Sequence, residues 1–275
     1  QSKTLIIHDE VHDLYAKEIG QKVIGKQNKF AYKLGLSATI KEPFNLDREK
    51  TLFHEIQGNY DKPIYSYDLI QAIEDGVLVE SVLIPLPYKL YDDEKLEIRK
   101  ARGKYEGRIK EGWLKHEAET QRNIEISKVR KNARNKIEVF NENIQFLKDK
   151  LIRSFVFADE TDYGKDLLNL LIPHVNVKTH FEGADKDNLK NFSNGKIDCI
   201  INVLKLSQGI DVQNLNTIIL FATPTGRQFI QRIGRVLRKD QNNPKKKAII
   251  IDFFDEDDLD NKVIDEDKES SDYRR

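Results

Sequence analysis

The sequence predicts an α/β protein in which two parallel-sheet domains, the first partial and the second complete, are joined by a helical, basic insertion. Three observations predict this class. Apolar strand-like runs alternate with helix-like segments over residues 153–255, as expected of a parallel sheet covered on both faces. A shorter alternation of the same kind occupies residues 1–90. Between them, residues 91–152 contain no proline and are dense in Lys, Arg and Glu, which indicates helix.

The first domain is expected to contain two strands with a helix between them. The runs "TLIIHDE" and "FAYKLGLSAT" have the composition of strands, and residues 13–24 have that of a helix. A third run, "VLIPLPYKL", closes residues 1–90. Its two prolines favour an edge strand or a linker over a central strand.

The insertion is expected to be helical throughout, and its second half carries an apolar stripe. The stripe favours packing on a partner helix or a domain, and a protein-recognition helix is the alternative. Three glycines weaken the first half, since each costs about 1 kcal/mol of helix propensity. The stripe comprises Ile126, Val129, Ala133, Ile137, Phe140, Ile144, Leu147 and Leu151, and the glycines are Gly103, Gly107 and Gly112.

The second domain is expected to alternate strands and helices up to residue 255, and residues 256–275 to form an acidic tail. The strand-like runs are "SFVFA", "VNVKTH", "DCIINV", "TIILFA" and "AIIIDFF". Helices are expected at about 163–171, 187–192 and 227–237. We expect the end of the tail to be disordered, with mimicry of DNA as the alternative.

The charges of the chain balance in total but are segregated. Lys and Arg number 46, as do Asp and Glu. Between residues 95 and 138, 14 Lys and Arg face 7 Glu, whereas residues 252–275 hold 11 Asp and Glu against 4 Lys and Arg. The basic block could bind a polyanion such as nucleic acid, and a solvated spacer between the domains is the equal alternative.

Cysteine usage and hydropathy indicate a soluble, intracellular protein. The single cysteine, Cys199, excludes an internal disulfide, and its apolar run predicts inert core packing. There is no signal peptide and no apolar run long enough to span a membrane. Because the chain starts inside an apparent domain and lacks methionine, we expect it to be a piece of a longer protein.

Polar residues that follow the strands are the candidate site. Asp9 and Glu10 end the first strand, where burying two adjacent carboxylates would be costly unless they face a cation such as Mg²⁺. Gln231, Arg235 and Arg238 are spaced to share one helix face in the second domain. A phosphate chain would satisfy both groups. Taken singly, the acids are also typical of a helix N-cap and the arginines of a solvated face.

In this order, the motifs "DEVH", "LGLSATI", "FVFA", "LKLSQGID" and "QRIGRVLR" resemble motifs II to VI of the superfamily 2 helicases. The resemblance spans almost the whole chain and implies RecA-like domains that hydrolyse ATP. The "DEVH" spelling and the run "YSYDLIQAIEDGVLVE" are similar to the XPB-like and UvsW-like DNA translocases and to the motors of type I and III restriction enzymes.

The resemblance implies a role for each motif residue. Asp9 would hold Mg²⁺ through water and Glu10 would activate the attacking water, while Arg235 and Arg238 would be arginine fingers. The other implied roles are coupling of nucleotide to nucleic acid for His12, Ser37 and Thr39, nucleotide contact for Gly209, Asp211, Gln231 and Arg232, and backbone contact for His180 and Gly183, a plain loop being equally consistent with the last two.

One departure from the family concerns the phosphate-binding loop. The near-match "GQKVIGKQ" ends in Gln27 where Ser or Thr is needed, and it follows the acid pair instead of preceding it. We interpret it as a helix end capped by Gly25, and expect the true loop upstream of Gln1. The piece alone is then expected not to hydrolyse ATP.

The resulting prediction is an ATP-dependent helicase or translocase that acts on nucleic acid, DNA in preference to RNA. Two alternatives stay open: a sensor or scaffold that ATP switches without strand separation, and the motor subunit of a restriction or defence complex. RNA is not excluded, because backbone contacts discriminate little except through the 2′-OH.

Overall fold

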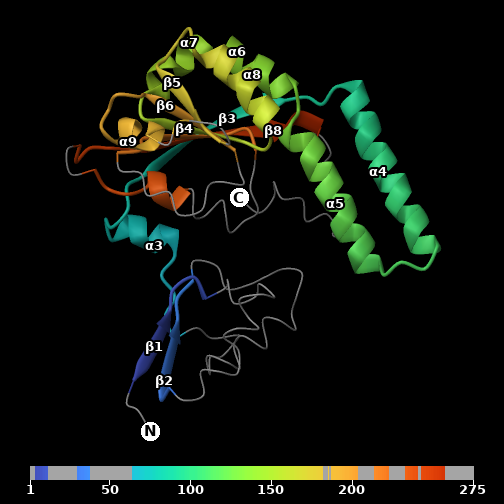
Figure 1. Ribbon diagram of the computed structural model, residues 1–275, viewed down its shortest axis with the longest axis horizontal. Helices are drawn as coiled ribbons and strands as arrows, with labels where there is room; N and C mark the ends of the chain where they lie inside the picture. Colours follow the sequence, from blue (N-terminus) through green and yellow to red (C-terminus); the bar gives the residue numbers. More distant parts are fainter. Residues whose placement is uncertain are drawn as a thin grey trace. The chain divides into compact units, whose positions relative to one another are not determined.

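The computed structural model describes residues 4–11, 30–37, 64–181, 185, 187–203, 214–222, 233–240 and 243–257 (Figure 1). These residues belong to two compact units, Gln1–Ala72 and Ile73–Arg275, each described by itself below. Within the described ranges, no helix has an apolar stretch long enough to cross a bilayer.

The first unit contains a parallel pair of strands, as the sequence predicts. β1 (Leu5–His8) pairs with β2 (Tyr32–Gly35), with Leu5 opposite Tyr32 and His8 opposite Gly35. The expected helix over residues 13–24 lies outside the described residues. α3 (Leu69–Glu74) follows at the end of this unit and continues into the next.

The second unit is built on a six-stranded, all-parallel sheet, which confirms the predicted fold class. The strand order is β3-β8-β7-β4-β6-β5. The strands are β3 (Ser81–Tyr88), β4 (Ser154–Ala158), β5 (Val177–His180), β6 (Cys199–Val203), β7 (Thr217–Leu220) and β8 (Ala248–Asp255).

Both faces of this sheet are covered, which is why its central strands are mostly apolar. Every residue of β4, β6 and β7 is buried. Val156 of β4 joins a cluster on one face that includes residues of α8 (Thr161–Leu171). On the opposite side of the same strand, the ring of Phe155 lies 5.0 Å from that of Phe192 in α9 (Asn188–Ser193).

The apolar stripe of the insertion packs onto this sheet. α6 (Asn135–Glu142), α7 (Ile144–Leu147) and the 3₁₀ turn η2 (Lys148–Leu151) lie over the sheet beside α8 (Figure 1). Their fully buried residues include Phe140, whose ring is 5.3 Å from that of Phe221. Packing on a domain was therefore the correct interpretation of the stripe, but the stripe occupies several short helices and not one long helix.

The remaining half of the insertion is a helical hairpin that extends away from the sheet (Figure 1). α4 (Asp92–Lys110) and α5 (Lys115–Lys131) pack against each other. The turn between them contains Gly112 at a φ of 99°, a conformation that favours glycine. Its tip exposes Trp113 and Leu114.

β3 does not belong where the sequence analysis placed it. We assigned residues 81–88 to the first domain, within residues 1–90, but β3 pairs in parallel with β8 from Ser81–Ala248 to Tyr88–Asp255. It is therefore an edge strand of the second sheet, and the compact units divide after Ala72. The prolines at 85 and 87 are tolerated because an edge strand has one row of backbone groups outside the ladder.

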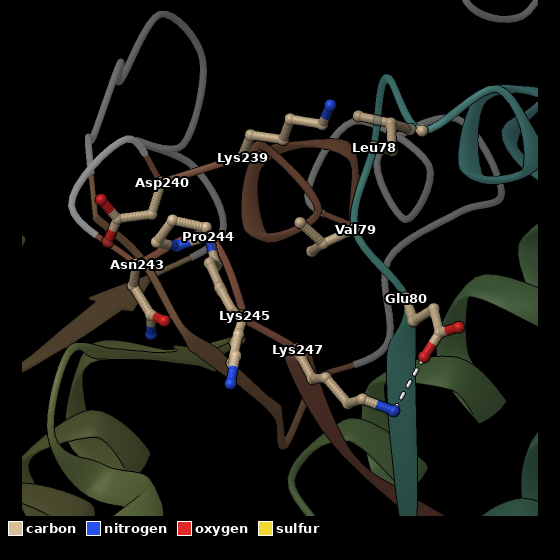
Figure 2. A pocket seen from close by; sticks show the side chains of 11 residues that line it. Leu78, Val79, Glu80, Lys239, Asp240, Asn243, Pro244, Lys245 and Lys247 are labelled. Carbon is tan, nitrogen blue, oxygen red and sulfur yellow. Dashed lines mark ion pairs between the residues drawn. The ribbon is translucent and has the colours of Figure 1, made fainter.

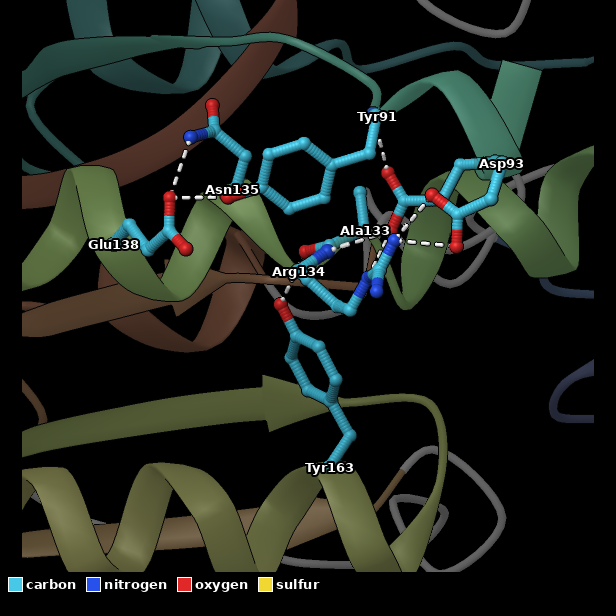
Figure 3. A network of polar contacts seen from close by, with 8 residues as sticks. Tyr91, Asp93, Ala133, Arg134, Asn135, Glu138 and Tyr163 are labelled. Atoms are coloured by element: carbon cyan, nitrogen blue, oxygen red, sulfur yellow. Dashed lines mark hydrogen bonds and ion pairs between the residues drawn. The ribbon is translucent and has the colours of Figure 1, made fainter.

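A polar network joins the base of the hairpin to the core (Figure 3). The Glu94 side chain, 7% exposed, accepts hydrogen bonds from the backbone N–H of Tyr91 at 2.8 Å and of Arg134 at 3.0 Å. Arg134 also donates to Asp93 Oδ2 at 2.6 Å. From the core, the Tyr163 hydroxyl donates to the Ala133 carbonyl at 2.9 Å. These bonds fix the point where the hairpin ends and α6 begins.

Candidate functional site

The predicted acid pair lies at the carboxyl end of β1. Asp9 is exposed and Glu10 half-buried. Asp9 Oδ1 accepts a hydrogen bond from the Glu10 backbone N–H at 3.0 Å. Glu10 has a φ of 48°, in the left-handed region that costs a residue with a Cβ roughly 1 kcal/mol. Backbone strain of this kind is often found at functional sites.

Backbone bonds to β2 hold this turn in place. The Leu36 N–H donates to the His8 carbonyl at 2.8 Å, and the Val11 N–H donates to the Leu36 carbonyl at 2.9 Å. Ser37, which follows directly, is half-buried. The structure therefore brings Asp9, Glu10 and Ser37 to the same edge of the β1–β2 pair, where ligands of parallel sheets collect.

In the second unit, the carboxyl edge of the sheet holds the base of the hairpin. Asp159 and Glu160 follow β4, and they pair with Lys131 at 3.4 Å and Lys128 at 2.9 Å, both in the last turn of α5. At the end of β8, Lys95 of α4 pairs with Asp257 at 2.6 Å. Several cations of the basic block are therefore neutralised here, so the net charge of that block overstates what a polyanion could reach.

The two predicted arginine fingers differ in local structure. Residues 233–236 are helical and include Arg235, which is half-buried. The helix ends there, and Arg238, exposed, forms an antiparallel bridge with Leu78. The helical spacing that we used to place Arg238 on one face with Arg235 therefore does not apply to it. The Leu237 carbonyl is taken by the Val79 N–H at 2.9 Å, which ends the helix.

His180 is the last residue of β5 and is half-buried. Burial lowers the pKa of its imidazole, so it is neutral at physiological pH. A neutral imidazole would contribute hydrogen bonding, and not charge, to any backbone phosphate. The remaining predicted site residues lie outside the described residues: His12, Thr39, Gly183, Gly209, Asp211, Gln231 and Arg232.

Sequence reasoning missed a buried lysine beneath the carboxyl edge. Lys136 is 3% exposed, and its ammonium donates to the carbonyl of Phe221, just after β7, at 2.9 Å. The same ammonium lies 4.6 Å from the ring centroid of Tyr88. A lysine within an apolar stripe was the available signal, because such a residue must find a partner when its helix is buried.

Cys199 is fully buried in β6, as predicted for a core cysteine. Burial raises the pKa of its thiol to about 12, so the reactive thiolate is scarce in the folded protein.

Comparison with known families agrees with this architecture. Residues 123–240 match the helicase conserved C-terminal domain, a range that begins within α5 and includes Arg235. This match agrees with the motif order and with the six-stranded parallel sheet, and it supports the predicted resemblance to the superfamily 2 helicases.

Two sequence relatives carry helicase or translocase names. The chain is 27% identical over 260 residues to helicase 22, a predicted helicase of Sulfolobus islandicus filamentous virus, covering 93% of this chain and 43% of that protein. It is also 27% identical over 274 residues to the DNA 3'-5' translocase XPB2 of Sulfurisphaera tokodaii, covering 90% and 58%. The chain therefore spans about half the length of these relatives.

Two solved structures share the fold. One is Dbp5 of S. cerevisiae bound to RNA and ADP BeF3, with a TM-score of 0.52 and 13% identity over 92% of this chain and 53% of that one. The other is the SWI2/SNF2 ATPase core of Sulfolobus solfataricus in complex with dsDNA, with a TM-score of 0.50 and 16% identity over 93% and 65%. The sheet of the second unit accordingly has the RecA-like fold.

Proposed function

We propose that this chain is part of an ATP-driven motor that moves on DNA. The observation that carries the proposal is the acid pair at the strained carboxyl end of β1, in a chain whose residues 123–240 match a helicase C-terminal domain. The relative named as a DNA translocase supports DNA as the track, and an intracellular location follows from such a track.

In this proposal Glu10 is the general base of ATP hydrolysis. Its carboxylate accepts a proton from the water that attacks the γ-phosphorus, while the bond from that phosphorus to the β,γ-bridging oxygen breaks. Arg235 and Arg238 offset the negative charge that develops on the transferred phosphoryl group. In a strand, successive side chains point to opposite faces of the sheet. Because Glu10 has a left-handed backbone conformation, the direction of its side chain does not follow this alternation.

The residues present fit a magnesium ion bound by few protein ligands. Mg²⁺ keeps most of its waters and needs only one or two carboxylates alongside substrate phosphates. Asp9 is exposed, and within the described residues its one hydrogen bond leaves carboxylate lone pairs available. When bound, the ion would neutralise phosphate charge, with Asp9 and Glu10 as its protein side.

The remaining motif residues keep the roles that the family resemblance implies. Gly209, Asp211, Gln231 and Arg232 would contact the nucleotide. His12, Ser37 and Thr39 would couple it to the nucleic acid, which His180 and Gly183 would contact along its backbone.

The α4–α5 hairpin is proposed to provide a second hold on duplex DNA. It rises from the carboxyl edge of the sheet, where its base is anchored by ion pairs. Four exposed cations of α4 form no ion pair with any described residue: Arg99, Lys100, Arg102 and Lys110. Their replacement by Gln should weaken duplex binding and leave DNA-independent ATP turnover unchanged; unchanged affinity by fluorescence anisotropy would assign the hairpin to a spacer role.

The function is tested by the ATPase rate of the complete protein with no nucleic acid, single-stranded DNA, duplex DNA and RNA. We expect DNA to stimulate turnover and RNA to stimulate it less. Stimulation by RNA alone would show that the motor moves on RNA and not on DNA. If none of the three stimulates turnover, the ATP-switched scaffold becomes the better account.

The arginine assignment has its own test. Arg235→Ala should reduce ATP turnover by about 10³-fold or more, the magnitude typical of an arginine finger. The fold should survive, because Arg235 is only half-buried. Lys148→Ala, in the exposed part of η2, is the control and should keep full turnover. Near-normal turnover of the Arg235 variant, with an unchanged circular dichroism spectrum, would remove this residue from the mechanism.

A further inference from the structure

A lysine-lined hollow lies at the opposite edge of the second sheet from the hairpin. Its volume is about 720 Å³, and two segments that are distant in sequence line it (Figure 2). The first contributes residues 76 and 78–80, and the second contributes residues 239–240 and 243–247. These segments lead into the amino ends of β3 and β8. None of the helicase motifs predicted from the sequence assigns a role to this edge.

Specific bonds hold the two walls of the hollow together. Lys247 and Glu80, which directly precede the two strands, form an ion pair at 2.8 Å. The Leu78–Arg238 bridge joins the walls a second time. Lys246 is 7% exposed, and its ammonium donates to the Arg238 carbonyl at 2.8 Å. The hollow is therefore a fixed feature of the fold, connected through Arg238 to the end of the arginine-bearing helix.

The hollow is positively charged. Four lysines line it against two acids, Glu80 and Asp240. Lys246 and Lys247 already have partners, which leaves Lys239 and Lys245 as the available cations. Both are exposed, and neither forms an ion pair with a described residue. The ammonium groups of Lys239 and Lys245 lie in the same hollow as that of Lys246, and like charges repel one another. A bound anion or screening by solvent reduces this repulsion.

The directions of these side chains indicate the kind of anion. In Figure 2 the ammonium groups of Lys239 and Lys245 point to different sides of the hollow, and Lys247 points to Glu80. A single phosphate ion would require converging donors. A chain of phosphates that passes along the edge can meet divergent lysines one after another, because its charges are themselves spaced along a backbone.

We propose that this hollow binds the phosphate backbone of a nucleic-acid strand through Lys239 and Lys245. This contact rests on the proposed function and adds to it a second, separate point of attachment at the amino edge of the sheet. The apolar part of the hollow, formed by Leu78, Val79 and Pro244, supports the sugar side of the backbone. The bond from the Val79 N–H to the Leu237 carbonyl links an occupied hollow directly to the helix that carries Arg235.

The test is the double variant Lys239→Gln/Lys245→Gln in the full chain. Binding is measured by fluorescence anisotropy with an oligothymidylate of about 20 nucleotides. Each phosphate contact on a single strand adds about 0.7 to the slope of log affinity against log salt, so the slope should fall by about 1.4. The same relation predicts about 25-fold weaker binding near 0.1 M salt.

The matched control is Lys178→Gln/Lys190→Gln, which removes two exposed lysines from β5 and α9. Its affinity and salt slope should remain those of the unmodified chain. If both double variants lose affinity equally, the effect is one of overall charge and the proposal is overturned. If the first variant keeps its affinity and slope while the unmodified chain binds, the hollow is not a nucleic-acid site, although the proposed function stands.

A competing source of phosphate is a nucleotide. If the double variant loses affinity for a fluorescent ATP analogue but keeps its affinity for the oligonucleotide, the hollow belongs to a nucleotide site and the proposal fails. If the unmodified chain binds no nucleic acid under any salt condition, it is the proposed function that fails.

Cross-linking gives a second readout that does not depend on affinity. The chain has one cysteine, and that cysteine is buried. A Lys245→Cys variant can therefore be labelled selectively with a photoactivatable azide. We expect cross-links to the oligonucleotide from position 245 and none from a Lys178→Cys control. Equal yields at both positions would contradict a defined contact.

Discussion

The six-stranded sheet and the α4–α5 hairpin belong to the same unit but are stabilised differently. Every residue of β4, β6 and β7 is buried. In the hairpin, α4 buries Glu94, Ile98, Ala101 and Tyr105, and α5 buries only Ala118. Because apolar burial is the main source of stability, the hairpin depends on polar contacts and helix propensity. We therefore expect it to open at a lower free energy than the sheet.

Polar and cation–π contacts join the two helices of the hairpin, which bury few apolar side chains. The Tyr105 hydroxyl donates to Glu125 Oε1 at 2.7 Å, and Lys104 pairs with the same oxygen. The Arg108 guanidinium lies 4.4 Å from the ring centroid of Trp113 and 5.0 Å from that of Tyr105. Exposed interactions of this kind each contribute little, so the hairpin can move without a large cost to the fold.

The largest expected effect concerns the hydrophobic core that packs on the six-stranded sheet. Phe140→Ala removes a fully buried ring that contacts Phe221 and Phe253, and should lower the free energy of unfolding by about 3–5 kcal/mol. Urea denaturation followed by circular dichroism measures the change. Leu96→Ala, an exposed position of α4, should stay within about 0.5 kcal/mol. Comparable losses in the two variants would show that hairpin and sheet are equally well packed.

A smaller effect is expected from the buried lysine that joins α6 to β7. Lys136→Met keeps most of the side-chain volume but leaves the Phe221 carbonyl without its donor, which should cost about 1–3 kcal/mol. The exposed control Lys148→Met should change stability by less than about 0.5 kcal/mol. If Lys136→Met were as stable as the unmodified chain, the hydrogen bond from Lys136 to the Phe221 carbonyl would contribute nothing to stability, and the side chain would act through packing alone.

The order and type of the strands could be predicted from sequence because they depend on local patterns. β4, β6, β7 and β8 are mostly apolar runs, as is typical of a parallel sheet covered on both faces. The partner of β3 could not be predicted, because its pairing with β8 joins residues more than 160 positions apart and no local pattern in the sequence specifies that pairing. Two prolines indicated an edge strand but not which sheet it borders.

The break between α5 and α6 was also beyond sequence reasoning. The apolar spacing continues through Ala133, so periodicity alone predicts one helix. Tertiary contacts end it: the Arg134 N–H donates to Glu94, and the Ala133 carbonyl accepts from Tyr163. Both partners are at least 30 residues away, so the competition for these backbone groups is visible only in the fold.

The candidate site divides in the same way. The position of Asp9 and Glu10 at a strand end followed from the sequence, because a short apolar run leads directly to them. The local structure of Arg238 did not, since its bridge to Leu78 crosses from a distant segment. The lysine-lined hollow was hidden for the same reason, although the run of lysines at 245–247 was a signal that could have drawn attention to it.

The smallest expected effect strengthens the hairpin alone. A Cβ added at Gly103 or Gly107 would meet no other atom within 4 Å, so Ala can replace both without a clash. Each replacement should stabilise α4 by up to about 1 kcal/mol. Hydrogen exchange of α4 amides should then slow by a factor of about 5–30 for the double variant, whereas the amides of β4 and β6 should exchange as before.

Gly112 provides the opposite control within the same hairpin. Its φ of 99° lies where a residue with a Cβ is strained, so Gly112→Ala should speed exchange in α4 and α5 despite the higher helix propensity of alanine. If exchange in β4 slowed together with α4 in the Gly103→Ala/Gly107→Ala variant, the two regions would open as one cooperative unit. The hairpin would then transmit strain to the sheet edge through the Glu94–Arg134 contact instead of moving independently of it.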